Sequence, residues 1–184
     1  MKHRSRVRLV CRALLVSSLA AGAVAPANAD AVPGMDWTSV GSAGTVDEAD
    51  VAAVSLDGAV AAHIGAAGRT MRIRYNVVAV DGLSGGNGIA LVGNLRDTGP
   101  GQVILTLKRY SFDTNLTEPL AELDSDRFAS SLNFQTRSTG TCEHSFDFTR
   151  YAYFVEAQLV RKAASPPLLS LPALAGVRVS SLWC

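Results

Sequence analysis

The chain has 184 residues, of which 48% are apolar and 18% are charged, with 17 basic against 16 acidic residues and three cysteines. This composition fits one ordinary globular domain and excludes a disulfide-dense mini-protein, a collagen, a disordered tail and a coiled coil. It contains no strong catalytic or binding signature, so it indicates the location and the fold of the protein more clearly than its chemistry.

The first 29 residues have the three parts of a secretory signal peptide. Lys2 and four arginines, with no acidic residue among them, precede an uncharged apolar run at 13–25. The small-residue triplet at 27–29, Ala-Asn-Ala, then supplies a cleavage site. An apolar run of this length is too short to span a bilayer. We therefore expect cleavage after Ala29 and a secreted or periplasmic mature protein without a transmembrane segment.

The mature chain is mildly acidic. Removal of residues 1–29 leaves 155 residues with 12 basic and 16 acidic groups, a formal charge of −4. A chain of this length can bury a core of its own. An acidic domain has no electrostatic reason to bind nucleic acid, because neutralising phosphates requires a basic face. The sequence thus predicts a single domain over residues 30–184 and no nucleic-acid partner.

Two cysteines remain after the leader, which carries Cys11, is removed. In an oxidising compartment an even pair is most simply one disulfide, here joining Cys184 to Cys142 in a loop 42 positions upstream. A redox pair and two metal thiolates are the alternatives. They are disfavoured because no C-x-x-C spacing is present and only His63 and His144 remain as imidazoles.

Short apolar runs separated by Gly, Asn, Asp and Pro clusters predict an all-β fold. We expect an antiparallel β-sandwich, of jelly-roll or immunoglobulin-like type, with about eight or nine strands. Alternation in one run places Met71, Ile73 and Tyr75 on one face and Arg72 and Arg74 on the other. The expected strands, in chain order, are 51–56, 59–64, 71–80, 89–95, 102–112, 119–123, 128–134, 146–160 and 174–179.

Residues 45–56 leave two alternatives open. Asp57 and Gly58 lie between two apolar runs, which is a signal for a tight hairpin with a strand on each side. Thr45 and Glu48 also form a T-x-x-E capping box ahead of an alanine-rich stretch, which is typical of a helix start. The segment is therefore either a strand or a short helix.

Residues 82–86 match G-x-S-x-G, the nucleophile elbow of α/β-hydrolases. A serine hydrolase would combine Ser84 with His144 and an aspartate such as Asp124. The elbow requires a helix directly after the serine, whereas residues from Asn87 onward read as loop and then strand. A glycine-rich hairpin loop accounts for the motif, so we assign no catalytic residue and keep these three as the candidates.

Carboxylate spacing gives a second set of candidates. Asp113 and Asn115 form D-x-N, and Asp124 and Asp126 form D-x-D, spacings that can place oxygens around calcium. An EF-hand loop would need glycine where Glu118 stands. Turn initiation by Asp and Asn is the favoured interpretation. We therefore expect no cofactor, and a structural calcium is the alternative. A pair of carboxylates that acts as in glycosidases is a separate alternative for these acidic residues.

Five aromatic residues gather at 146–154 and are expected to pack in the core rather than to stack on sugars, since phenylalanine outnumbers tyrosine there. Arg72 and Arg74 share a polar strand face that is expected to be solvated, although it could meet an anionic group on a partner. His63 and His144 are expected to be structural.

Two segments, RYNVVAVDGL at 74–83 and SFDFTRYAYFVEAQ at 145–158, resemble parts of uncharacterised small exported bacterial proteins. The resemblance implies a bacterial exported β-protein with no assigned activity, and it supplies no catalytic residue. Three functions follow as hypotheses. The first is a non-enzymatic sandwich that binds a glycan or another envelope protein. The second is a small secreted hydrolase using Ser84 with His144, or a carboxylate pair. The third is a structural envelope component that associates through an exposed sheet edge.

Overall fold

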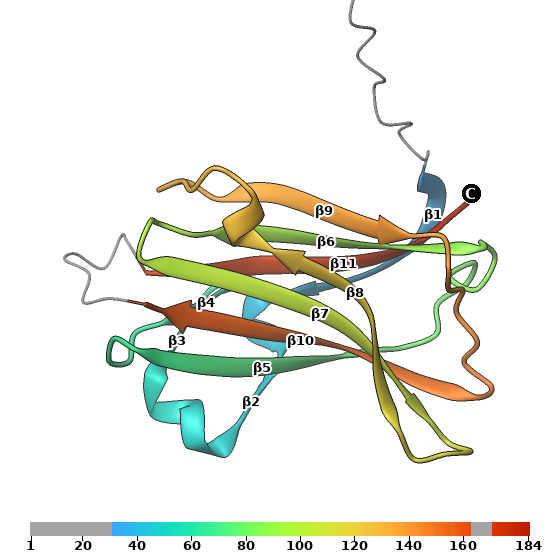
Figure 1. The fold of residues 1–184 in the computed structure, drawn as a ribbon, viewed down its shortest axis with the longest axis horizontal. Coiled ribbons are helices and arrows are strands. Elements are labelled where there is room, and N and C mark those ends of the chain that lie inside the picture. Colours follow the sequence, from blue (N-terminus) through green and yellow to red (C-terminus); the bar gives the residue numbers. More distant parts are fainter. Residues whose placement is uncertain (1–30, 163–170) are drawn as a thin grey trace, which may run out of the picture.

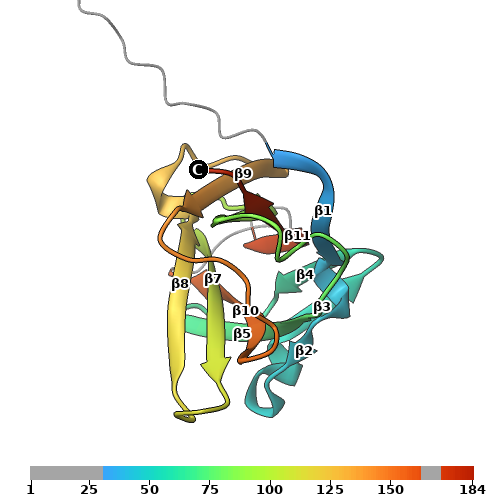
Figure 2. The ribbon, with the colours of Figure 1, turned by 90° about the vertical axis from the view of Figure 1, so that its right-hand side faces the viewer.

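The computed structural model describes residues 31–162 and 171–184, with side chains described from Asp36 onward. The expected leader, 1–29, lies outside the described residues. The described part is all-β, with two antiparallel sheets packed against each other (Figures 1 and 2). Its strands are β1 Ala31–Val40, β2 Thr45–Val46, β3 Val54–Asp57, β4 Val60–His63, β5 Arg69–Val77, β6 Gly88–Arg96, β7 Gly101–Ser111, β8 Thr117–Asp124, β9 Gln135–Thr141, β10 Tyr151–Arg161 and β11 Ala173–Leu182. Its 3-10 helices are η1 Gly41–Ala43, η2 Glu48–Ala53 and η3 Ser125–Arg127.

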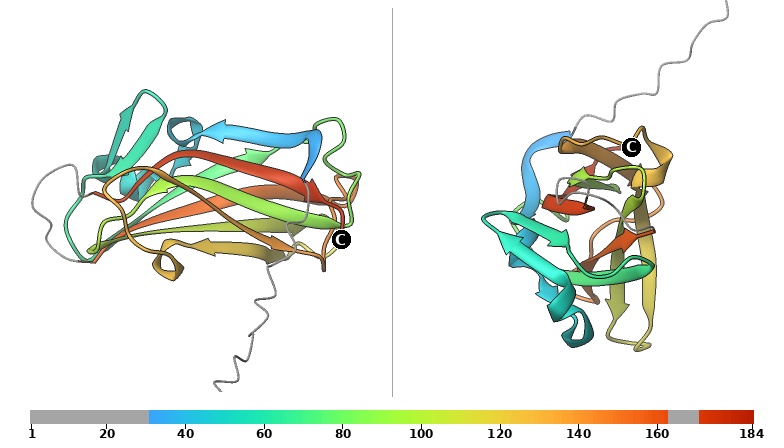
Figure 3. Two further views of the ribbon diagram at one scale, coloured as in Figure 1. Left: turned by 90° about the horizontal axis from the view of Figure 1, so that it is seen from above. Right: turned by 90° about the vertical axis from the view of Figure 1, so that its left-hand side faces the viewer.

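The larger sheet has six strands in the order β3-β4-β11-β6-β9, with β1 also paired to β11. The smaller sheet has five strands in the order β2-β5-β10-β7-β8. Figure 2 looks along the strands and shows β9 and β11 in one layer and β5 and β10 in the other. The left view of Figure 3 looks onto the six-stranded sheet, where β1 lies beside β11. The predicted β-sandwich is therefore confirmed.

A single hydrophobic core fills the space between the sheets, and alternating side chains of both sheets supply it. On β5 the predicted faces are confirmed, since Met71, Ile73 and Tyr75 are buried whereas Arg72 and Arg74 are exposed. The same period buries Val103, Leu105 and Leu107 on β7 and Tyr153, Val155, Ala157 and Leu159 on β10. Because one face of each strand packs inward, the opposite faces of both sheets are left to face solvent.

The structure has eleven strands rather than eight or nine. The expected strand at 128–134 is wrong, because this segment is a loop in which the Phe128 and Phe134 rings lie 5.0 and 5.1 Å from the guanidinium groups of Arg137 and Arg96. The strand follows the loop, as β9. It is a polar edge strand that pairs only with β6, so it carries no apolar signature. Strands β1 and β2 were likewise not predicted.

Both alternatives for residues 45–56 are partly realised. Residues 48–53 form η2, and the strand begins only at Val54. The predicted hairpin is confirmed, since Asp57 pairs with Val60 across a turn in which Gly58 has φ of 55°. The capping box does not form: the residue before η2 is Asp47, which makes no side-chain cap and instead binds Arg74 at 2.6 Å.

The strand expected over 146–160 begins only at Tyr151. Residues before it form a loop in which Asp147 bonds locally, its carboxylate accepting from the Thr149 backbone N–H at 3.0 Å. Phe146 and Phe148 nevertheless pack on Tyr153, with ring centroids 4.9 Å away in each case. Because Asp147 forms local hydrogen bonds, the strand begins at a later residue than predicted, although the aromatic side chains before it still reach the core.

The predicted disulfide between Cys142 and Cys184 is confirmed, with Cα atoms 5.9 Å apart. It joins the loop after β9 to the residues after β11, at one end of the sandwich. The Cys184 backbone N–H also donates to the Asn87 side chain at 2.7 Å. Within residues 31–162 and 171–184, no helix is long and apolar enough to cross a bilayer.

Candidate functional site

No hydrogen bond joins any two of the three hydrolase candidates in the described part of the chain. Ser84 is exposed in the loop before β6, and His144 lies in the loop after β9, with no hydrogen bond between them in the described structure. Asp124 ends β8, where its carboxylate accepts from the Gln102 amide at 2.8 Å and from the Asp126 backbone N–H at 3.0 Å. No helix follows Ser84, since turns lead directly into β6.

The calcium candidates have partners within the protein. Asp113 pairs with Arg150 at 3.4 Å, and Asp126 pairs with Lys162. Asn115, whose φ is 57°, accepts a hydrogen bond from the Tyr110 hydroxyl at 2.7 Å. Among the described residues, no group of three or more His, Cys, Asp or Glu side chains is placed to hold a metal ion. These side chains order turns and form ion pairs.

His63 is fully buried at the end of β4. Its Nδ1 accepts from the Gly65 backbone N–H at 3.0 Å, so in the neutral ring the proton is on Nε2, which has no hydrogen-bond partner in the described part of the chain. Burial lowers the pKa of His63 below its ordinary value of 6.5, the Arg161 charge lowers it further, and the Arg69 carbonyl and Asp50 act in the opposite direction. The buried ring is therefore held neutral.

This burial predicts a pH dependence of stability. Between the ordinary pKa of 6.5 that His63 has in the unfolded chain and its lower pKa in the folded protein, the unfolded chain binds more protons at His63 than the folded protein does. The free energy of unfolding is therefore expected to fall as the pH falls, by up to about 1.4 kcal/mol per pH unit, until the folded pKa is reached. Urea unfolding between about pH 7 and pH 5 measures this slope. His63→Gln should flatten it, and an unchanged slope in that variant would contradict the assignment to His63.

The outer surface of β5, β10 and β7 forms a polar face, which we call the five-strand face. Alternation along β10 turns Tyr153 into the core and therefore turns Phe154 outward. The other four aromatic residues of 146–154 belong to the core or pack against it, whereas Phe154 does not. Phe154 pairs with Asn76 on β5 and with Lys108 on β7, so an amide residue and a basic residue flank it in the register.

Glu156 lies at the centre of this face and is only 7% exposed. Its Oε1 accepts from Lys108 Nζ at 2.8 Å and from Gln158 Nε2 at 3.3 Å, and its Oε2 lies 3.6 Å from Arg74 Nε. Burial raises the pKa of Glu156, but Lys108, Gln158 and Arg74 together lower it by more, so the net shift is downward. The carboxylate is therefore ionised and fixed between two cations.

Two polar side chains of the five-strand face have no partner among the described residues. The side chains of Arg72 and Asn76 are exposed and make no hydrogen bond or ion pair with any residue that the structure describes. Sequence reasoning singled out Arg72 and Arg74 but did not single out Glu156, and its expectation that the aromatic residues of 146–154 pack in the core is wrong for Phe154. The sequence did contain a pattern that places Phe154 and Glu156 on the outer face. The alternation that buries Val155, Ala157 and Leu159 on β10 turns the residues between them outward.

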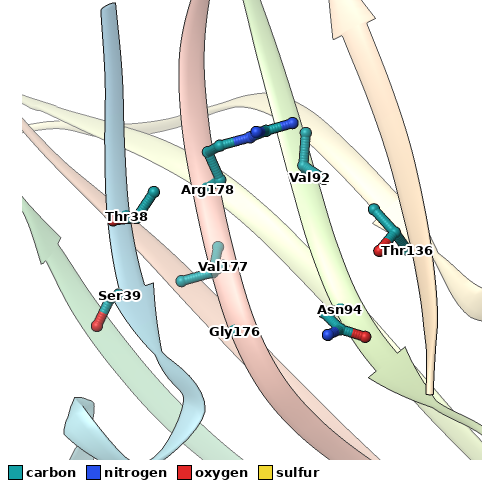
Figure 4. Close-up of a pocket in the computed structure, with 8 residues that line it drawn as sticks. All are labelled: Thr38, Ser39, Val92, Asn94, Thr136, Gly176, Val177 and Arg178. Carbon is teal, nitrogen blue, oxygen red and sulfur yellow. The ribbon is translucent and has the colours of Figure 1, made fainter. Parts of the chain in front are cut away.

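A hollow of about 280 Å³ lies on the outer surface of the six-stranded sheet (Figure 4). We call it the Gly176 trough, because β11 has no side chain at that position and its pairing with β6 shifts between Leu174 and Gly176. Figure 4 shows Thr38 of β1 on one side of β11 and Val92 of β6 on the other. The lining residues are Thr38, Ser39, Val92, Asn94, Thr136, Gly176, Val177 and Arg178.

The chain matches none of the protein-family models and none of the curated proteins with which it was compared. Its function must accordingly be inferred from its own side chains. Two surfaces offer binding chemistry, the five-strand face and the Gly176 trough, and they lie on opposite sheets of the sandwich.

Proposed function

We propose that the protein is an exported, non-catalytic binding protein that takes a glycan on the five-strand face. The observation that carries the proposal is the position of Phe154, an aromatic ring on a polar sheet face between Asn76 and Lys108. The disulfide between Cys142 and Cys184 fits an oxidising, extracytoplasmic location, as the signal-peptide pattern also indicates.

A sugar requires two kinds of contact. The C–H face of a pyranose packs on an aromatic ring, and its hydroxyl groups exchange hydrogen bonds with polar side chains. Phe154 offers the ring. Asn76 lies opposite the ring on β5 and offers an exposed amide, and Arg74 and then Arg72 follow along the same face of β5, with Gln158 opposite Arg72 in the register.

The face is also ordered before any ligand arrives. Glu156 fixes Lys108 and Arg74 through the ion pairs described above, and Arg74 is held from its other side by Asp47. Side chains that already occupy one arrangement lose less conformational entropy on binding. A rigid polar face around a partly exposed ring therefore suits a ligand whose hydroxyl groups have fixed positions.

Phe154→Ala is expected to weaken glycan binding about tenfold or more, because it removes the stacking surface and leaves the fold intact. A glycan array identifies the strongest ligand, and calorimetric titration with that ligand gives the affinity of each variant. Ile104→Ala is the matched control, since Ile104 is a partly exposed apolar residue of the same face that has no ring. A silent array, or equal losses in the two variants, would overturn the proposal.

A further inference from the structure

Gly176 differs from the other described glycines that lie within strands. A Cβ atom added at Gly88, Gly93, Gly101 or Gly140 would lie 3.1 Å or less from another heavy atom, so those positions have little or no room for a side chain. At Gly176 the nearest atom would be the Ser39 carbonyl oxygen at 3.4 Å, an ordinary contact, and the backbone is not left-handed. Neither packing nor backbone conformation requires glycine at this position.

A glycine inside a strand weakens the strand, because it has no side chain to pack and loses more backbone freedom on folding. Where no neighbouring backbone requires the space, two reasons for such a glycine remain: the irregular pairing of β11 with β6 between Leu174 and Gly176, and the close approach of a ligand. The absent side chain keeps the floor of the trough open down to the backbone of β11.

The polar side chains around this floor can all donate hydrogen bonds, and Arg178 can only donate. Arg178 uses one N–H group in a long ion pair with Asp36, with Nη1 to Oδ2 at 3.5 Å, which leaves its other donors available. The side chains of Thr38, Asn94 and Thr136 are exposed and make no hydrogen bond within the part of the chain that the structure describes. No carboxylate lines the trough.

We infer that the Gly176 trough is a second binding site, for a small hydroxylated carboxylate of about the size of one sugar acid. An arginine matches a carboxylate in charge and in planar geometry, and amide and hydroxyl groups suit the hydroxyls of the same ligand. A volume of about 280 Å³ is at the small end of ligand sites and holds such a molecule. The inference is independent of the glycan site, since the two surfaces lie on different sheets.

The test is an NMR titration of the isotope-labelled protein with D-glucuronate, and with D-glucose as the neutral control. Saturable shifts are expected with glucuronate at the backbone amides of Val92, Thr136 and Arg178, with at least tenfold weaker binding of glucose. Gly176→Val should abolish these shifts by filling the trough. It should leave the fold intact, as a thermal unfolding scan checks, because a Cβ atom has room at this position and β-branched residues suit strands. Arg178→Gln should weaken glucuronate binding at least tenfold.

Three outcomes of the titration would contradict the inference. Equal shifts with glucose and glucuronate would mean that Arg178 does not recognise the carboxylate, and shifts that persist in folded Gly176→Val would mean that the ligand binds elsewhere. The absence of any saturable shift would mean that the trough is not a binding site. Phe154→Ala should leave glucuronate binding unchanged, and Gly176→Val should leave binding of the array ligand unchanged. Failure of one site is thereby distinguished from failure of the other.

Discussion

Replacing Cys142 and Cys184 together by serine is expected to lower the free energy of unfolding by about 4 kcal/mol. The disulfide closes a loop of 42 positions, and without it the unfolded chain regains the conformational freedom that this closure removes. The ends that it joins follow β9 and β11, the two strands that flank β6, so its loss also frees one edge of the six-stranded sheet.

Urea unfolding of the double variant without reductant measures the effect as a lower midpoint. Wild-type protein in reductant is the control and should unfold at the same midpoint as the variant, since both lack the bridge. If the oxidised wild type and the variant shared one midpoint, the disulfide would contribute nothing to stability.

Gly41→Ala is expected to destabilise the protein by about 3 kcal/mol or more, because the new methyl group would overlap the backbone of β11. The added Cβ would lie 1.9 Å from the Leu174 carbonyl oxygen, and neither backbone can move without disturbing the sheet. The Gly41 carbonyl also accepts a hydrogen bond from the buried Tyr75 hydroxyl at 2.6 Å. A shift of Gly41 would leave that hydroxyl unpaired in the core, which carries a further penalty.

Gly176→Ala is the matched control, because it adds the same methyl group to β11 at a position where the nearest atom would be 3.4 Å away. Its stability should stay within about 1 kcal/mol of the wild type. Urea unfolding of the two variants compares them directly. Equal midpoints would mean that the close approach of Gly41 to β11 does not limit stability.

The local pattern of the sequence predicts much of the fold, because strands that pack on one core must alternate. Thus β5 and β7 lie close to their expected positions, and the hairpin at Gly58 forms as its turn signal indicates. Alternation carries no information on a polar edge strand, which is why β9 was missed. A short helix within 45–56 was one of two alternatives, and the sequence could not decide between them, because the contacts of the 3-10 helix with β5, among them the Arg72 backbone N–H donating to Asp50 at 2.9 Å, are set by the tertiary structure.

The two proposed sites differ in how far sequence can predict them. The five-strand face follows from the period of β10, so Phe154 and Glu156 were accessible to sequence reasoning once the inward residues of that strand were fixed. The Gly176 trough depends on β1, β11, β6 and β9 lying side by side, and no local pattern reports that arrangement. Only the three-dimensional structure shows that Gly176 has open space above it.

The position of β11 has a consequence for how the protein folds. This strand follows all its partners in the chain, yet it lies inside the six-stranded sheet and pairs with β1, β4 and β6. During synthesis, β1, β4 and β6 are made before β11, so each has an unpaired edge until β11 has been synthesised. Pairings over such long sequence separations are slow to form, so the half-finished chain is the species most exposed to aggregation and to chaperone binding.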